Sequence, residues 1–347
     1  MLAPLSAPGC GVPKLASCLQ IADFSGRAPS FDTPQEAHAY YEPAVAIHDT
    51  NEAALAATSL GLIVLLQGRP TSALRWLRES AALLDEYDPL GSRPWPLAFA
   101  VQAAAQAGDA AGASSALGRA EAVARSGAPL QESNICLGRA WLACVEGALS
   151  EAHHLAREAA AIAERRGQLS SAAMALHDLA RMGDRERAAP LLSKVLPRVE
   201  GGLFRAFGLH ADALLSRDAP ALEACAAGFL ELGAMLYAAE ATAAAAVAYT
   251  EAGRESSAHR AAARAVSLRA RCDGAVTPLL STSSSLGDLT RREREIAALA
   301  ASGLSSAEIA MRLVLSVRTV DNHLHHVYGK LGVRHREDLV EVFAQSE

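Results

Sequence analysis

The sequence of 347 residues lacks the motifs that mark several common classes of enzyme. It has no G-x-x-x-x-G-K-[ST] phosphate-binding loop, so ATP hydrolysis is not expected. It also lacks the alternation of strands and helices that forms a phosphate-accepting receiver domain. No paired carboxylates and no nucleophile–base set stand out. The sequence therefore predicts neither an enzyme nor a bound cofactor.

Long apolar runs and paired cysteines are missing too. No stretch reaches the roughly 18 uncharged apolar residues that a membrane-spanning helix needs, and residues 222–249 are interrupted by three glutamates. We expect no membrane partner and a cytoplasmic location. The cysteines include no C-x-x-C pair and are expected to be small buried residues in a reducing compartment. They are Cys10, Cys18, Cys136, Cys144, Cys225 and Cys272.

The residues up to about 271 are rich in alanine and leucine and are expected to be helical throughout. A turn residue is followed five positions later by alanine, at intervals of 33 to 40 residues, in the pairs Gly68/Ala73, Gly108/Ala113, Gly147/Ala152, Gly183/Ala188, Ser216/Ala221 and Gly253/Ala258. Nine positions after each turn comes a small or apolar residue: Leu77, Leu117, Ala156, Leu192, Cys225 or Ala262. Glycine would close the first helix of a hairpin, and alanine would let the second helix pack closely against it.

This pattern resembles degenerate tetratricopeptide (TPR) repeats, although most aromatic positions of that family are missing. The sequence thus predicts an all-α chain that begins with an irregular helical-hairpin (TPR-like) solenoid, and a compact all-α bundle is the alternative. Each repeat of a solenoid contacts chiefly its neighbours. The array would therefore form a curved surface on which an effector or a partner protein docks.

Composition sets the expected domain boundaries. Residues 1–34 contain five prolines and are expected to be a flexible lead-in to the repeat region, residues 35–271. Residues 272–288 combine Pro278 with a serine cluster, which is typical of a flexible linker. Residues 289–347 have a different pattern and are expected to form a second, smaller domain.

Three helix starts in this second domain follow from capping chemistry. Thr290 with Glu293, and Ser305 with Glu308, match the capping box, in which a hydroxyl and a glutamate satisfy free amides of the first turn. Ser316 is a third cap, without the glutamate. Because so few residues separate the second helix from the third, the two form a helix–turn–helix.

The third helix, residues 317–331, has one apolar stripe, made of Val320, Leu324, Val327 and Leu331, that must face the domain's own core. The opposite face is polar and would fit the major groove of DNA, where asparagine pairs with adenine and arginine with guanine. Phosphate contacts are expected at its margins. The candidate DNA-binding residues are Ser316, Arg318, Thr319, Asp321, Asn322, His323, His325, His326, Lys330 and Arg334.

The segment resembles the LuxR/GerE-type DNA-binding domain. The matching motifs are Leu289-Thr290, Arg292-Glu293, Gly303-Leu304-Ser305, Glu308-Ile309-Ala310, Ser316, Thr319-Val320, His323 and Lys330-Leu331-Gly332-Val333. The resemblance implies a four-helix domain with residues 317–331 as recognition helix and a fourth helix, from Arg336, that commonly mediates dimerisation. Together with the helical array, it is similar to the C-terminal part of MalT-like regulators.

Two features depart from the family pattern. Asp321 stands where many members carry lysine, and the family's base-contacting positions fall on Asp321, Asn322 and His325, so a different DNA site is expected. The chain is also not basic overall, with a formal charge of −6 at pH 7. Residues 316–336 nevertheless hold four basic residues against one acid. Modest, salt-dependent affinity per protomer favours a homodimer on paired half-sites.

We therefore expect a sequence-specific regulator that binds double-stranded promoter DNA and whose helical array senses an effector. A protein-interaction adaptor with a vestigial helix–turn–helix is the alternative. For Asn322 and His325 an ordinary solvated helix face remains the competing interpretation. No cysteine or carboxylate set accompanies His323, His325 and His326, so a metal site is not expected there.

Overall fold

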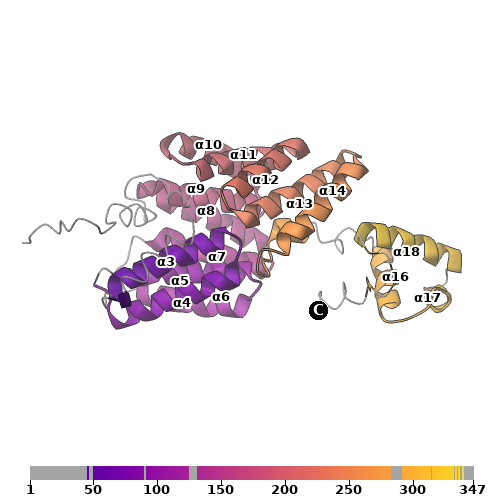
Figure 1. Ribbon diagram of the computed structural model, residues 1–347, viewed down its shortest axis with the longest axis horizontal. Coiled ribbons are helices and arrows are strands. Elements are labelled where there is room, and N and C mark those ends of the chain that lie inside the picture. The colour runs from indigo at the N-terminus through magenta and orange to yellow at the C-terminus, as the bar shows by residue number, and fades with distance from the viewer. Residues whose placement is uncertain are drawn as a thin grey trace, which may run out of the picture. The chain divides into compact units, whose positions relative to one another are not determined.

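The computed structural model describes residues 45–46, 50–89, 91–124, 131–282, 291–313, 315–331, 333, 335–336 and 338–339. These residues form helices and turns, and no β-strand occurs among them. The chain divides into two compact units, Met1–Leu280 and Ser281–Glu347 (Figure 1). The all-α fold class predicted from the sequence is confirmed, and the two units are described separately below.

In the first unit the described residues form six helical hairpins, each made of a first helix, a short turn and a second helix. The hairpins are α3 (Thr50–Leu66) with α4 (Pro70–Glu86), α5 (Pro94–Gln106) with α6 (Ala110–Ala124), α7 (Glu132–Val145) with α8 (Leu149–Arg165), α9 (Leu169–Arg181) with α10 (Arg185–Val195), α11 (Gly202–Ser216) with α12 (Ala219–Glu231), and α13 (Met235–Glu251) with α14 (Glu255–Arg269). A short 3₁₀ helix, η3 (Leu196–Arg198), follows α10, and α15 (Pro278–Thr282) follows the last hairpin.

The turns within the hairpins explain the repeat seen in the sequence. In five of the six, the predicted glycine has a positive φ, between 68° and 112°, which a residue without Cβ adopts at no steric cost. The alanine five positions later is buried in each of these hairpins, as Ala73 and Ala113 illustrate, with no exposed surface. Small side chains therefore sit where the two helices approach each other.

The prediction for the fifth hairpin is displaced by one residue. The left-handed position is occupied by Arg217, with φ 52°, and not by Ser216. Counting five and nine positions from Arg217 gives Leu222 and Ala226, both fully buried, whereas the predicted Ala221 is only half-buried. A search that expects glycine or serine at the turn misses an arginine that adopts this conformation.

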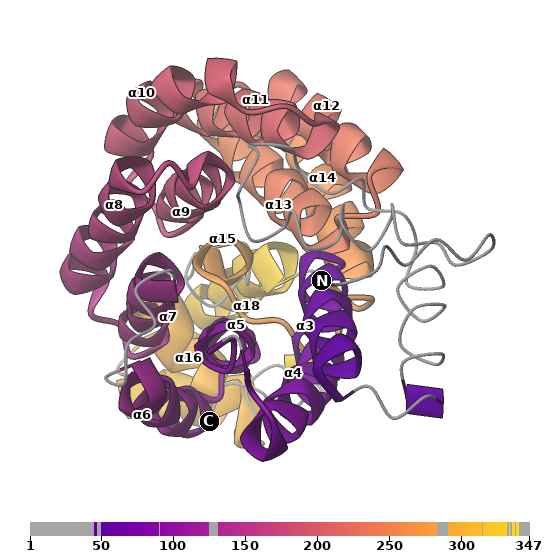
Figure 2. The same ribbon diagram turned by 90° about the vertical axis from the view of Figure 1, so that its left-hand side faces the viewer.

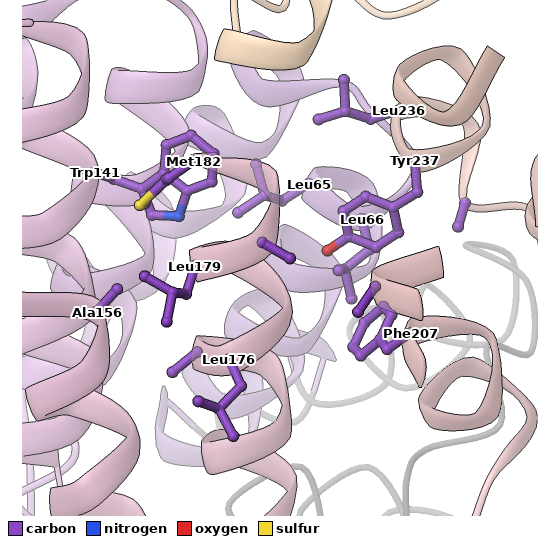
Figure 3. Close-up of a cluster of buried hydrophobic side chains, with 14 of the residues drawn as sticks. Leu65, Leu66, Trp141, Ala156, Leu176, Leu179, Met182, Phe207, Leu236 and Tyr237 are labelled. Atoms are coloured by element: carbon purple, nitrogen blue, oxygen red, sulfur yellow. The ribbon is translucent and has the colours of Figure 1, made fainter. Parts of the chain in front are cut away.

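The first helices of the hairpins converge in the interior. Figure 3 shows side chains from several of them in one cluster, including Leu66 of α3, Trp141 of α7, Leu179 of α9, Phe207 of α11 and Tyr237 of α13. Every residue of α5 is buried, as are most residues of α3 and α13. Among the inner helices, α5 is thus covered on all sides and α3 and α13 on most of theirs.

The array also closes on itself. Its hairpins follow a curved path that brings α13 beside α3 (Figure 2). The approach is close, because a Cβ added to Gly68 would lie 2.8 Å from the backbone nitrogen of Leu236. Contacts between the first and last hairpins are not a feature of an open solenoid, in which a repeat touches only its neighbours.

A charged cluster lies within this core. The guanidinium of Arg181 donates to both carboxylate oxygens of Glu240, at 2.7 and 2.9 Å, and to Asp178 at 2.5 Å, and it stacks over the rings of Trp141 and Tyr237. Although burial acts to lower it, the pKa of Arg181 stands well above its usual value because Glu240 and Asp178 lie beside it. Burial raises the pKa of Asp178 in spite of that neighbour. The cluster therefore joins the hairpins that begin with α7, α9 and α13, and the last of these does not follow directly on the second in the chain.

Next to this cluster, His177 of α9 and His210 of α11 share a hydrogen bond of 3.0 Å between Nε2 and Nδ1. The His177 ring is stacked on Phe207. Burial lowers the pKa of His210 to about 3 and also lowers that of His177, where the charges of His210 and Arg181 contribute. Both rings are therefore neutral at pH 7.

The four cysteines among the described residues are Cys136, Cys144, Cys225 and Cys272, and all are buried free thiols, as predicted. Burial raises the pKa of the first three to about 11 and that of Cys272 to about 12. Such thiols carry almost no thiolate at neutral pH, which makes them poor nucleophiles. Cys10 and Cys18 lie outside the described residues.

The segment after α14 differs from the flexible linker predicted for residues 272–288. Cys272, Ala275 and Leu280 are almost completely buried and belong to the core of the first unit, and Pro278 begins α15 instead of a loop. Apolar residues between the predicted linker's polar ones account for this packing. Residues 283–288 lie outside the described part of the chain. No helix among the described residues is long and apolar enough to cross a membrane.

Candidate nucleic-acid interface

The described residues of the second unit include three helices, α16 (Arg291–Ala301), α17 (Ser306–Leu313) and α18 (Val317–Leu331). Their apolar faces meet in a separate small core, which also receives Leu339. The buried members are Ile296, Ala297, Ala300, Ile309, Ala310, Val320, Leu324, Val327 and Leu339. This core holds α17 and α18 at a fixed angle through side chains that the helical periodicity places inward.

The start of α17 is set by a capping box, as the sequence predicts. Glu308 accepts hydrogen bonds from the backbone amide and hydroxyl of Ser305, both at 2.7 Å, and its own amide donates to the Ser305 hydroxyl at 3.3 Å. The bonds from Ser305 lower the pKa of Glu308. Gly303, with φ 93°, ends the preceding helix and reverses the chain. The first predicted box cannot be compared, because Thr290 lies outside the described residues.

The start of α18 is fixed by local bonds in the same way. The amide of Thr319 donates to the hydroxyl of Ser316 at 3.1 Å, and the two hydroxyls lie 2.7 Å apart. The amide of Leu315 donates to the carbonyl of Ala310 at 2.9 Å and so ends α17. The third predicted cap is therefore confirmed, and the turn between α17 and α18 is short.

One residue that anchors this turn was not predicted. Arg292 of α16 donates from Nη2 to the carbonyl oxygen of Leu313 at 2.8 Å, and its Nη1 lies 2.7 Å from Glu295. The bond satisfies a carbonyl at the C-terminus of α17, where a cation is also favoured by the helix dipole. Arg292 belongs to a motif that matches the family, but its bond to Leu313 could not be predicted, because the two partners are 21 positions apart.

The apolar stripe of α18 faces the core as predicted. Val320 and Val327 have no exposed surface, and Leu324 is 4% exposed. The side chain of Leu331 lies outside the described residues. With three of the four stripe residues buried, the orientation of α18 about its own axis is determined.

The opposite face of α18 is open. Arg318, Asp321, Asn322, His325 and His326 are exposed, and the rings of the two histidines lie 6.4 Å apart, centroid to centroid. Ser316 is exposed at the N-terminal end of the helix, and Thr319 and His323 are half-buried at its edges. The side chain of Lys330 is not described, and Arg334 lies outside the described residues. The structure thus places nine of the ten candidate residues on α18 or at its cap, eight of them with side chains that are described.

This face offers hydrogen-bond donors and acceptors in place of apolar surface. Asn322 carries both an amide donor and a carbonyl acceptor, Arg318 only donors, and Asp321 only acceptors when ionised. Each histidine ring carries one donor and one acceptor nitrogen when neutral. Such a mixture suits the edges of base pairs in the major groove, which present donors and acceptors side by side.

Comparison with known proteins agrees with this geometry. Residues 288–343 match the family described as bacterial regulatory proteins, luxR family. The chain is 49% identical over 59 residues to a putative HTH-type transcriptional regulator of Mycobacterium bovis. The matched segment covers 17% of this chain and 7% of that protein. It is 49% identical over 63 residues to the probable HTH-type transcriptional regulator GfsR of Streptomyces halstedii, 18% of this chain and 26% of the relative.

The oxygen regulatory protein NreC of Staphylococcus aureus is 43% identical over 60 residues, 17% of this chain and 28% of that protein. The matches therefore span between 7% and 28% of the length of these three relatives. They show that the C-terminal unit is a LuxR-family helix–turn–helix domain.

Proposed function

We propose that this chain is a sequence-specific DNA-binding transcriptional regulator in which α18 is the recognition helix. The observation that carries the proposal is the polar, exposed face of α18, set opposite a buried apolar stripe on a LuxR-family helix–turn–helix. Relatives that share this domain are named as transcriptional regulators. A regulator of this kind acts by binding and not by catalysis.

Within the groove, the central position belongs to Asn322, which points directly away from the buried stripe. An asparagine there pairs with the N6 and N7 atoms of adenine. Arg318, one turn earlier, would pair with guanine, and Asp321 would accept from the amine of cytosine. His325, His326 and His323 extend the contact along the groove, each as a donor or an acceptor.

Phosphate contacts would orient the helix on the duplex. Ser316 and Thr319 lie at the N-terminus of α18, where hydroxyls and free amides suit a phosphate. Lys330 and Arg334 complete the set at the other end. Because the net charge of this face is small, one protomer neutralises few phosphates, and we infer that two protomers bind paired half-sites.

The helical array would supply the input. It is a separate compact unit and is much larger than the DNA-binding domain. We propose that it receives an effector or a partner protein in the cytoplasm. Its inner helices are buried, so binding there requires the array to open, whereas its outer surface is accessible without any change.

The test is selection of binding sites from a random double-stranded DNA library by the full chain, followed by affinity measurements at several salt concentrations. Asn322→Ala and His325→Ala should each weaken the selected site by about 1–3 kcal/mol, the worth of one good base contact. His154→Ala replaces another exposed histidine, on α8 of the array, and should have no effect. Failure to enrich any sequence would refute the proposal.

An adaptor role for the array, with a helix–turn–helix that no longer binds DNA, is the second candidate. Asp321 favours it, because an exposed carboxylate on the reading face repels phosphates. The two functions differ in the cell. If the Asn322→Ala, His325→Ala double variant kept all regulatory effects of the wild-type chain, the adaptor would be the better account.

A further inference from the structure

The array is closed by the residues that follow its last helix. After α14 the chain returns to the first two hairpins, and Cys272, Ala275 and Leu280 enter the core with no more than 1% of their surface exposed. We call residues 272–280 the clasp. The clasp is the last part of the first unit, so the same residues that close the array also begin the connection to the DNA-binding domain.

At its beginning the clasp caps a helix that cannot cap itself. The N-cap residue of α4, Arg69, makes no side-chain capping bond. Asp273 provides one instead, because its Oδ2 accepts from the amide and from the hydroxyl of Ser72, both at 2.9 Å. A carboxylate at this end of a helix is also favoured by the helix dipole. The cap is supplied from 201 positions away in the sequence.

A second helix end is satisfied three residues later. The amide of Val276 donates to the carbonyl of Gln106, the last residue of α5, at 2.7 Å. The backbone between the two contacts turns through left-handed conformations at Asp273 and Gly274, with φ 49° and 79°. The clasp therefore joins the start of α4 and the end of α5 to the end of α14.

The cap at the start of the clasp is solvent-exposed, in contrast to the buried charged cluster of the core. Ser72 and Asp273 are both accessible to water, which competes for their hydrogen bonds. Water weakens this cap, and the clasp lies outside the six hairpins, so it can detach while the hairpins stay folded.

We propose that the clasp is a conformational switch that sets the reach of the DNA-binding domain. When it is closed, ten residues, 281–290, connect Leu280 to Arg291, where α16 begins. Release adds the nine clasp residues, each of which extends a chain by up to about 3.3–3.6 Å. A signal that separates the first hairpin from the last would thus lengthen the connection to the DNA-binding domain by up to roughly 30 Å.

The proposal rests on the proposed function only for the use of that reach, because its first test involves no DNA. Cys272 is a natural reporter, since it is buried when the clasp is closed and becomes reactive when it opens. In the full chain, alkylation of each cysteine can be followed by peptide mass spectrometry. Cys144, a buried cysteine on α7 away from the clasp, serves as the internal reference for opening of the whole unit.

Asp273→Gly removes the cap while leaving the left-handed backbone unstrained. It should raise the alkylation rate of Cys272 about five- to tenfold, the effect of losing one N-cap, and leave that of Cys144 unchanged. The matched control is Asp218→Gly, which removes the carboxylate that caps α12 through Ala221 within a single hairpin. This control should not change the reactivity of Cys272.

Equal reactivity of Cys272 in the two variants would overturn the clasp, and so would a parallel rise at Cys144. The gain in reach is tested by small-angle X-ray scattering of the full chain with Asp273→Gly and Leu280→Asp combined, which detaches both ends of the clasp. The maximum dimension should increase while the helical circular dichroism is retained. An unchanged dimension with a reactive Cys272 would refute the switch. If instead the clasp opens as predicted but the full chain selects no DNA site, the proposed function is refuted and the proposal of a clasp that opens is not.

Discussion

The buried charged cluster makes the most quantitative prediction about the array. Arg181 and Glu240 have side chains that are 1% and 0% exposed, and both oxygens of Glu240 accept from the guanidinium. Replacing Glu240 by glutamine keeps the shape but leaves the cation of Arg181 with Asp178 as its remaining charged partner. Breaking a buried ion pair on one side typically costs about 3–5 kcal/mol.

That loss is large beside the total stability of a domain, about 5–15 kcal/mol. Glu251→Gln is the matched control, because Glu251 pairs with Arg217 at 3.0 Å but the two side chains are 47% and 53% exposed. An exposed pair contributes about 0–1 kcal/mol. The free energy of unfolding of each variant can be measured by urea titration followed by circular dichroism, with the slope checked to be the same as in the wild type.

A triple variant separates charge from packing. Arg181→Met, Glu240→Leu and Asp178→Asn together replace the cluster by neutral side chains of similar size. The indole Nε1 of Trp141 donates to Asp178 at 2.8 Å, and an amide oxygen at position 178 can still accept this bond. Because removing all the charges leaves none of them unpaired, this variant should be more stable than Glu240→Gln. If Glu240→Gln and Glu251→Gln lowered stability by the same small amount, the assigned role of the cluster would be refuted.

Three further predictions concern other sites. Burial lowers the pKa of the neutral His210 to about 3 from its ordinary value of 6.5, so the unfolded chain binds more protons than the folded one below about pH 6.5. Stability should be fully present above that pH and fall by up to about 1.4 kcal/mol per pH unit as the pH decreases. Urea titrations at pH 7 and pH 5 should show a smaller fall for His210→Asn than for the wild type. Ser305→Ala should lower the stability of the DNA-binding domain by about 1 kcal/mol, measured as a lower thermal midpoint of that unit. The control Ser302→Ala replaces an exposed serine that caps no amide and should leave the midpoint unchanged. Asp321→Asn should relax base preference at one position of each half-site by about 1–3 kcal/mol, as read by repeating the selection from random DNA, and an unchanged consensus would contradict a base contact at this residue.

Local signals in the sequence were enough to predict the DNA-binding domain. The hydroxyl caps at Ser305 and Ser316 act within three residues, and the stripe of α18 repeats every three or four, so both follow from helix geometry alone. The same holds for the hairpin turns closed by glycine. The turn at Arg217 was displaced because an arginine takes the left-handed position there, where the amides of Arg217 and Asp218 both donate to the carbonyl of Ala213 and end the helix.

Contacts between distant positions could not be predicted. Asp178 and Arg181 look like an ordinary pair on a helix surface, and only the fold brings Glu240, 59 positions further on, to complete the cluster. The clasp has the same origin, because a composition typical of linkers conceals apolar residues that pack once the array has closed. The filled interior of the array likewise depends on curvature, which no single repeat encodes.

The central claim is that the exposed face of α18 contacts base edges. A photo-cross-linking amino acid at position 325 of the full chain, irradiated on its selected DNA site, tests this claim most directly. The account predicts cross-links to bases in the major groove of each half-site, and none from the same group at position 209, an exposed site on α11. Cross-links from position 209 but not from position 325 would contradict it.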